Sequence, residues 1–199
     1  MVKKNFSMRR TFGIVGESLR EGFLIRRFKA EDGREVTLRA PRWSDLDDAL
    51  DFINSLVEEG AEINVNQKTT RDAETDWMAR HLSAVEKDRE IAVAAEVAGR
   101  FIGQVTVEPG DGRSQHVGVL GIAIRSGYRD VGIGTELMRE AEIQARRLGL
   151  KILKLEVYAT NSRAHHVYEK QGYRVVGRVP KVVLKDGAYT DSIIMTKEL

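Results

Sequence analysis

RDVGIG, residues 129–134, is the stretch that decides how this chain folds. It follows a β-prone run at 116–124 and precedes a helical stripe that includes Leu137 and Ala141. Glycines two positions apart let the backbone approach a ligand closely, and a helix N-terminus carries roughly half a positive charge. The stretch is therefore predicted to be a strand-to-helix turn that binds an anion. Tight packing of the strand against the helix would explain the same two glycines.

The residues around these glycines favour a diphosphate as the anion. Arg129 can supply a guanidinium and Thr135 a hydroxyl to the same phosphates. Two competing nucleotide motifs fail, because Leu137 replaces the third glycine of a dinucleotide fingerprint and no GK pair is followed by Ser or Thr. The predicted anion contacts are Arg129, Asp130, Val131, Gly132, Ile133, Gly134 and Thr135.

Composition limits the classes of protein to consider. The 199 residues, 42% of them hydrophobic, suit one domain, and 32 Lys and Arg against 30 Asp and Glu argue against nucleic acid as a partner. No run approaches the roughly 18 apolar residues of a membrane helix, and the N-terminus has no signal-peptide pattern, so we expect a cytoplasmic protein without membrane contact. Without cysteine, thiolate chemistry is excluded. Adjacent His165 and His166 would point about 100° apart on a helix, so no metal site is predicted.

The rest of the chain alternates between strand and helix patterns. Strands are predicted at 22–28, 34–40, 91–97, 101–108, 116–124, 152–157, 173–179 and 192–196, and helical patterns at 46–57, 72–86, 137–148 and 162–171. Short connections make the strands between 91 and 124 an antiparallel meander. The sequence thus predicts an α/β (α+β) fold, with a single mixed, mostly antiparallel central sheet flanked by helices and an N-terminal β-hairpin.

Two segments carry a resemblance to a known family. Arg129, Gly132 and Gly134 match the R/Q-x-x-G-x-G/A signature of the GNAT superfamily of N-acetyltransferases, in the strand-to-helix context that this family requires. Some thirty residues on, LEVYATNSRAHHVYEKQGY at 155–173 resembles the family's second coenzyme segment. Its matching positions are Asn161, Ala164, Tyr168 and Gly172. The chain is similar to the ribosomal-protein and small-amine branches of the superfamily.

The resemblance implies a domain organisation and a co-substrate. It covers residues 34–199, which are expected to form a GNAT-like N-acetyltransferase domain, and leaves 1–33 as an extension with part of the hairpin. Acetyl-CoA is the co-substrate that it implies. The hairpin could also pair an edge strand with a second copy of the chain, so a two-fold homodimer through residues 1–30 is one expectation.

The resemblance also assigns parts of the coenzyme site. The strand end at Ile122, Ala123 and Ile124 is expected to splay from its neighbour and expose backbone groups to the pantetheine arm. An ordinary buried strand would fit those letters equally well. The side-chain amide of Asn161 is expected to bond the coenzyme, although Asn at this position could also be a helix N-cap.

Acyl transfer from a thioester to an amine requires a proton donor and a proton acceptor. Tyr168 is the candidate acid, because its phenol can donate one proton without prior charge; the alternative is a core aromatic that only holds the coenzyme. Glu156 is the candidate base by resemblance, and a surface ion pair with Lys154 is its alternative. Glu108 and His116 are substitutes for the base.

The acceptor is predicted to be a primary amine, either a protein N-terminus or a lysine, that attacks the thioester directly in a ternary complex. A small-molecule amine such as a polyamine, an amino acid or an antibiotic is the alternative, and a non-catalytic acyl-CoA sensor is the alternative of another class. The acceptor site is expected along the first two helices and the segment 181–189, including Glu59, Glu62, Glu74 and Trp77.

Overall fold

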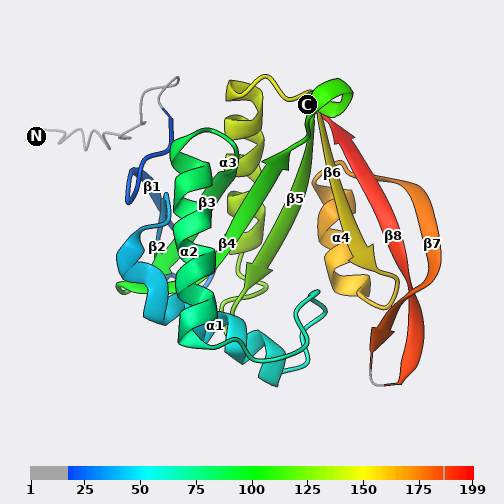
Figure 1. Cartoon of the computed structure of the whole chain (residues 1–199), viewed down its shortest axis with the longest axis horizontal. Coiled ribbons are helices and arrows are strands. Elements are labelled where there is room, and N and C mark those ends of the chain that lie inside the picture. The colour runs from blue at the N-terminus through cyan, green and yellow to red at the C-terminus, as the bar shows by residue number, and fades with distance from the viewer. Residues whose placement is uncertain (1–17, 186) are drawn as a thin grey trace, which may run out of the picture.

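A computed structural model describes residues 18–185 and 187–199, which form one eight-stranded sheet with α-helices on both faces (Figure 1). The strands are β1 (Leu24–Lys29), β2 (Glu35–Arg39), β3 (Ile91–Val97), β4 (Arg100–Pro109), β5 (Val117–Ile124), β6 (Ile152–Tyr158), β7 (Arg174–Lys185) and β8 (Ala188–Glu198). The α-helices are α1 (Leu46–Glu58), α2 (Arg71–Glu86), α3 (Ile133–Arg147) and α4 (Ser162–Lys170), with 3-10 turns η1 (Trp43–Asp45) and η2 (Gly112–Ser114).

The strand order is β1-β2-β3-β4-β5-β6-β8-β7, and only the β5–β6 pair runs parallel within the described sheet. The predicted fold class is confirmed, and β3, β4 and β5 form the predicted antiparallel meander. No helix in the described part of the chain is long and apolar enough to cross a membrane.

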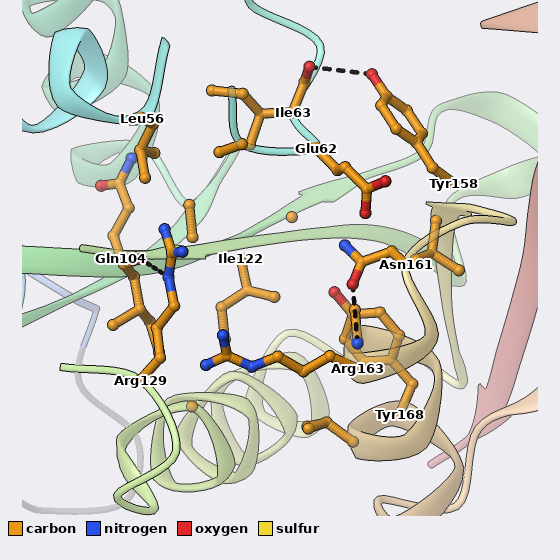
Figure 2. Close-up of a pocket in the computed structure, with 18 of the residues that line it drawn as sticks. Leu56, Glu62, Ile63, Gln104, Ile122, Arg129, Tyr158, Asn161, Arg163 and Tyr168 are labelled. Carbon is orange, nitrogen blue, oxygen red and sulfur yellow. Dashed lines mark hydrogen bonds between the residues drawn. The ribbon is translucent and has the colours of Figure 1, made fainter. Parts of the chain in front are cut away.

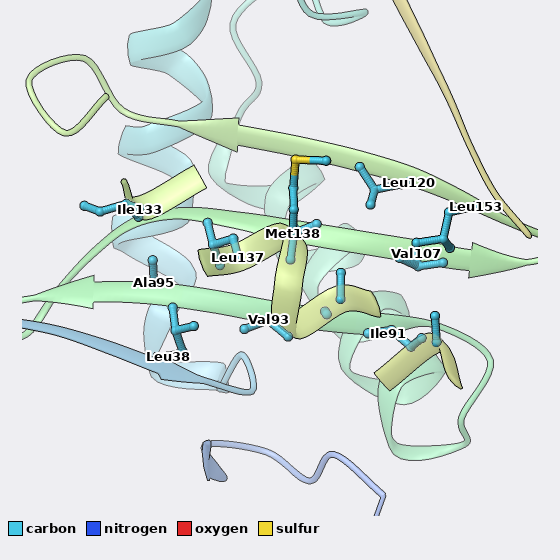
Figure 3. Packing of buried hydrophobic residues seen from close by; sticks show 14 of the residues in the cluster. Leu38, Ile91, Val93, Ala95, Val107, Leu120, Ile133, Leu137, Met138 and Leu153 are labelled. Atoms are coloured by element: carbon cyan, nitrogen blue, oxygen red, sulfur yellow. The ribbon is translucent and has the colours of Figure 1, made fainter. Parts of the chain in front are cut away.

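Helices bury opposite faces of this sheet. Leu137 and Met138 of α3 lie in one cluster with Val93 of β3, where Figure 3 shows them facing the strands. On the other face, the Phe52 ring of α1 meets the Phe101 ring of β4 edge to face, with centroids 5.4 Å apart. The buried stripe of α1 is Leu46, Ala49, Phe52 and Leu56, at the spacing of a helix that covers a sheet.

The β1–β2 hairpin braces the RDVGIG turn. The Glu31 backbone N–H at the hairpin tip donates a hydrogen bond to the Val131 carbonyl at 3.0 Å. Arg34 adds a second contact, because its guanidinium donates to the Gly127 carbonyl at 2.8 Å. The hairpin, which lies about a hundred residues earlier in the chain, thus holds the outer side of the turn in place.

The N-terminal part of the chain is therefore only partly separate from the rest. β1 is hydrogen-bonded to β2 as the edge strand of the central sheet. The division of the chain into an extension up to residue 33 and a domain from residue 34 stays a prediction, as does a homodimer through residues 1–30. Residues 1–17 of the expected extension lie outside the described residues.

The β5–β6 pair is short and then opens. Its register covers three residue pairs, from Val117 with Ile152 to Val119 with Lys154. Beyond them β5 continues along β4 to Ile124, and β6 continues along β8 to Tyr158. The splay expected at the end of β5 is present, and it is visible between the two strands in Figure 1.

Gly118, in the middle of this short pairing, has no room for a side chain. A Cβ there would lie 2.5 Å from Val107 Cγ1 and 2.8 Å from Leu150 Cδ1, both in the core. We expect Gly118→Ala to lower the free energy of unfolding by about 1–3 kcal/mol, the usual cost of overpacking. Urea denaturation measures this. Gly121→Ala on the same strand is the control, since its Cβ would meet only Thr106 Oγ1 at 3.3 Å. Equal losses in both variants would contradict the prediction.

Candidate active site

A cavity of about 880 Å³ opens where β5 and β6 separate. Its walls are the loop after α1, the inner strands β4 and β5, the RDVGIG turn, the end of β6 and helix α4. Figure 2 shows Arg129 on one side of Ile122, and Asn161 and Tyr168 on the other. The gap in the sheet therefore connects the helix α3 side with the helix α1 side, and the two sequence segments that carry the resemblance meet there.

The RDVGIG turn has the predicted geometry. Gly132 is the N-cap of α3 in the left-handed conformation, with φ of 83°, which favours glycine. Gly132, Gly134 and Thr135 line the cavity, whereas the Ile133 side chain is buried in the core. The backbone N–H groups of Ile133, Gly134 and Thr135 have no acceptor among the described residues, as expected in the first turn of a helix. These three N–H groups are free to donate to a ligand in the cavity.

Arg129 is held by its own chain rather than extended towards the cradle. Its Nε donates to the Ile124 carbonyl at 2.6 Å, and its guanidinium forms an ion pair with Glu59 at the end of α1. Arg129 therefore closes the end of β5 against α1. A role at the phosphates would require it to exchange at least one of these partners.

Arg163 is a site residue that the sequence reasoning missed. It extends from the first turn of α4 towards the Arg129 side of the cavity in Figure 2. Its guanidinium lies 2.9 Å from the Asp130 carboxylate. Its position two residues after Asn161 was the available signal, because an N-cap places the next residues in the first helical turn. Asp130 adopts a left-handed backbone, with φ of 61°.

Asn161 caps helix α4 and also faces the cavity. Its Oδ1 accepts a hydrogen bond from the Ala164 N–H at 3.0 Å, so the N-cap interpretation is confirmed. Its amide nitrogen donates to none of the described residues and borders the cavity. The two roles considered from the sequence are compatible, because the cap uses only the oxygen.

Tyr168 lies about two turns further along α4, packed against the main core and lining the cavity. Its ring is 6.1 Å from the Tyr173 ring. Burial raises the pKa of Tyr168 to about 12, because the phenolate would lose its hydration. The hydroxyl therefore stays protonated at neutral pH and can act as a donor.

Glu156 lines the cavity but has an ordinary partner. Its carboxylate lies 3.0 Å from Lys154 Nζ on the same face of β6, and its side chain is 51% exposed. The surface ion pair considered as its alternative is thus present. The two substitutes are not brought to the site: Glu108 and His116 are exposed and do not line the cavity.

The expected acceptor residues divide into two groups. Glu59 and Glu62, in the segment after α1, line the cavity. Glu74 and Trp77 of α2 do not line the cavity. Glu74 is instead buried, which raises the pKa of its carboxyl, and the Trp77 ring stacks on the His81 ring with centroids 4.5 Å apart. The loop after α1, rather than α2, therefore faces the gap.

Comparison with known proteins decides the family. A model of the acetyltransferase (GNAT) family matches residues 51–173, which include both the RDVGIG turn and helix α4. The chain belongs to the acetyltransferase (GNAT) family. The predicted enzyme class, an acyltransferase, is confirmed by this membership, and the predicted co-substrate acetyl-CoA agrees with it.

Relatives within and around this family vary in acceptor. The L-amino acid N-acetyltransferase AaaT of Escherichia coli (strain K12) is 30% identical over 107 residues, 53% of this chain and 66% of AaaT. YwnH of Bacillus subtilis (strain 168), whose name gives phosphinothricin acetyltransferase as its proposed activity, is 25% identical over 82% of this chain and 99% of its own. YncA from Salmonella typhimurium, solved with its cofactor acetyl-CoA, has the same fold, with a TM-score of 0.72 at 18% identity over 82% of this chain and 94% of that one.

The ionisation of Tyr168 gives a test of its environment. An unfolded tyrosine ionises near pH 10, so Tyr168 contributes stability that is full below pH 10 and lost as the pH rises towards 12. At pH 10.5, folded Tyr168→Phe should show the same tyrosinate absorbance at 295 nm as the unmodified protein. In urea at this pH, the tyrosinate absorbance of the variant should be about one-fifth lower than that of the unmodified protein, because the chain has 5 tyrosines. A clear loss of tyrosinate absorbance in the folded variant would mean that Tyr168 is solvated.

Proposed function

We propose that this protein transfers an acetyl group from acetyl-CoA to the primary amine of a small molecule, by direct attack in a ternary complex. The observation that carries the proposal is the cavity through the sheet, which joins an anion cradle on one face to a charged pocket on the other. AaaT and YwnH are both named for small amine acceptors, and this supports the small-molecule alternative. These two names lend no support to a protein N-terminus or a lysine side chain as the acceptor, which is the first prediction from the sequence.

The residues present fit acetyl-CoA, which supplies the acetyl group as a thioester. Three free N–H groups at the start of α3, together with the helix dipole, suit a diphosphate. Asp130 would repel phosphate through its carboxylate, so it contributes by its backbone, while Arg163 and Thr135 offer a guanidinium and a hydroxyl. Arg129 joins them only by releasing Glu59.

The opened strand receives the pantetheine arm. Ile122, Ala123 and Ile124 line the cavity on the edge of β5 that β6 has left, so their backbone groups can bond the amides of the arm. The Asn161 amide nitrogen is a further donor on the opposite wall. This path leads the thioester from the α3 N-terminus towards Tyr168.

Glu156 acts on the acceptor ammonium and Tyr168 on the leaving sulfur. Glu156, directly or through water, takes one proton from the acceptor ammonium, and the neutral amine attacks the carbonyl carbon. The nitrogen then loses its second proton to water as the carbon–sulfur bond breaks and the thiolate leaves. Tyr168 donates a hydrogen bond to the sulfur as charge develops. Full transfer from a phenol of pKa about 12 to a free thiolate, whose conjugate acid has a pKa of about 8.5, is uphill by about 5 kcal/mol, so solvent completes the protonation of the leaving thiolate.

Thiol release with a panel of amines tests the function. The panel contains free amino acids, a polyamine, an N-terminal peptide and a lysine peptide, each with acetyl-CoA. We expect release above background hydrolysis with at least one small amine and little with the peptides. Preferred turnover of a peptide would restore the protein acceptor, and tight coenzyme binding without any turnover would indicate a sensor.

Two substitutions test the proton roles. At saturating acetyl-CoA and amine, Glu156→Gln should lower kcat by roughly 100-fold, the lower end of general acid–base effects. Tyr168→Phe should lower kcat by a similar factor of about 100, the cost of removing one hydrogen-bond donor to developing charge. Glu108→Gln is the matched control for Glu156, because Glu108 is exposed and does not line the cavity. An unchanged kcat in Tyr168→Phe would reduce that residue to packing, and an unchanged kcat in Glu156→Gln would leave its carboxylate to the ion pair with Lys154.

A further inference from the structure

The charged side chains that line the cavity are mostly paired. Three ion pairs account for five of them: Arg129–Glu59, Arg163–Asp130 and Glu156 with the neighbouring Lys154. The other two charged lining residues are Glu62 and Lys185, and neither forms an ion pair with any residue in 18–185 or 187–199. The described wall thus presents one uncompensated anion and one uncompensated cation.

Glu62 lies on the loop after α1 and points into the cavity. Its Oε1 accepts a hydrogen bond from the Thr160 hydroxyl at 2.5 Å. The next residue of the loop is fixed as well, since the Ile63 carbonyl accepts from the Tyr158 hydroxyl at 3.0 Å. Figure 2 shows the Glu62 carboxylate directed from the loop towards Asn161. A half-buried carboxylate is therefore held on the Asn161 side of the gap.

Lys185 approaches the same loop from the last residue of β7. Its Nζ donates to the Gly60 carbonyl at 2.7 Å, two residues before Glu62 in sequence. A neutral carbonyl satisfies one of the three donors of an ammonium, and no carboxylate of the described residues balances the charge of Lys185. The cation and the anion are consequently positioned by one short stretch of backbone.

We propose that Glu62 and Lys185 together bind a zwitterionic acceptor, an α-amino acid, with Glu62 on its ammonium and Lys185 on its carboxylate. This rests on the proposed function and names the substrate class of the same site. An α-amino acid carries its two charges on neighbouring groups, which suits an anion on the loop after α1 and a cation hydrogen-bonded to the same loop. A polyamine would meet Lys185 with a like charge, and a peptide N-terminus has an amide where Lys185 requires an anion.

The experiment compares free acids with their α-carboxamides. Leucine, phenylalanine and glutamate are each assayed in both forms by acetyl-CoA thiol release. The carboxamide amine is less basic and more of it is neutral at pH 7, so basicity alone favours the carboxamide. We expect the reverse, a kcat/KM at least tenfold higher for the free acid of the preferred side chain. No preference for the acid would overturn the proposal.

Substitutions separate the two charges. Lys185→Met should lower kcat/KM for the free acid about tenfold more than for the carboxamide, while Lys185→Arg keeps the preference. Glu62→Gln should lower both by a similar factor, because both substrates carry the ammonium. Matched controls are Lys87→Met and Glu58→Gln, whose side chains do not line the cavity. Equal losses for acid and carboxamide in Lys185→Met would contradict the proposal.

Failure of the proposed function has a separate signature. If no amine is acetylated, that function is wrong, and carboxylate recognition is then read by calorimetry. Free acid and carboxamide are titrated into the protein saturated with coenzyme A. Binding of the acid alone, lost in Lys185→Met, would support the proposal without turnover. Absence of binding by either form, or equal binding of both, would overturn it.

Discussion

The brief parallel contact between β5 and β6 is the constraint on which the rest of this molecule depends. Three residue pairs join the two strands. Beyond Val119, β5 is paired only with β4, and beyond Lys154, β6 is paired only with β8. A buried backbone N–H or C=O without a partner costs free energy, so strands rarely separate inside a sheet. Here the freed groups border a cavity, where water or a ligand amide can satisfy them. The split therefore creates a site that requires hydrogen-bonding partners.

The sheet remains one unit despite the split, because the halves are tied together outside it. β6 is paired with β8 over seven residue pairs, so the C-terminal half keeps a continuous hydrogen-bonded ladder. The loop after α1 crosses the gap and is held there by Tyr158, Thr160 and Lys185, all from the C-terminal half. These polar bonds position the loop without filling the space below it. This wall of the cavity is thus built from residues about a hundred positions apart.

Local patterns in the sequence were sufficient to predict much of the fold and part of the candidate site. The RDVGIG turn, the Asn161 cap and the helical stripes follow from backbone preferences within a few residues, and they were predicted correctly. The closing strand β7 was predicted to end at residue 179, but it continues to Lys185, because its register with β8 shifts between Val179 and Val183 and pairing then resumes. The pairing of Arg129 with Glu59, 70 residues away, is set by the tertiary fold and has no sequence pattern of its own.

The charged residues at the two ends of the cavity differ in what they leave available to a ligand. Arg163 and Asp130 are 49% and 72% exposed, and a pair so well solvated contributes at most about 1 kcal/mol. Releasing Arg163 to a diphosphate therefore costs little, while the cradle N–H groups gain the partners they lack. At the other end, Glu62 and Lys185 have only neutral partners among the described residues, so a ligand of complementary charge would displace no ion pair. The cavity can accept anionic charge at the turn at little cost, and it presents both signs of charge where the loop crosses the gap.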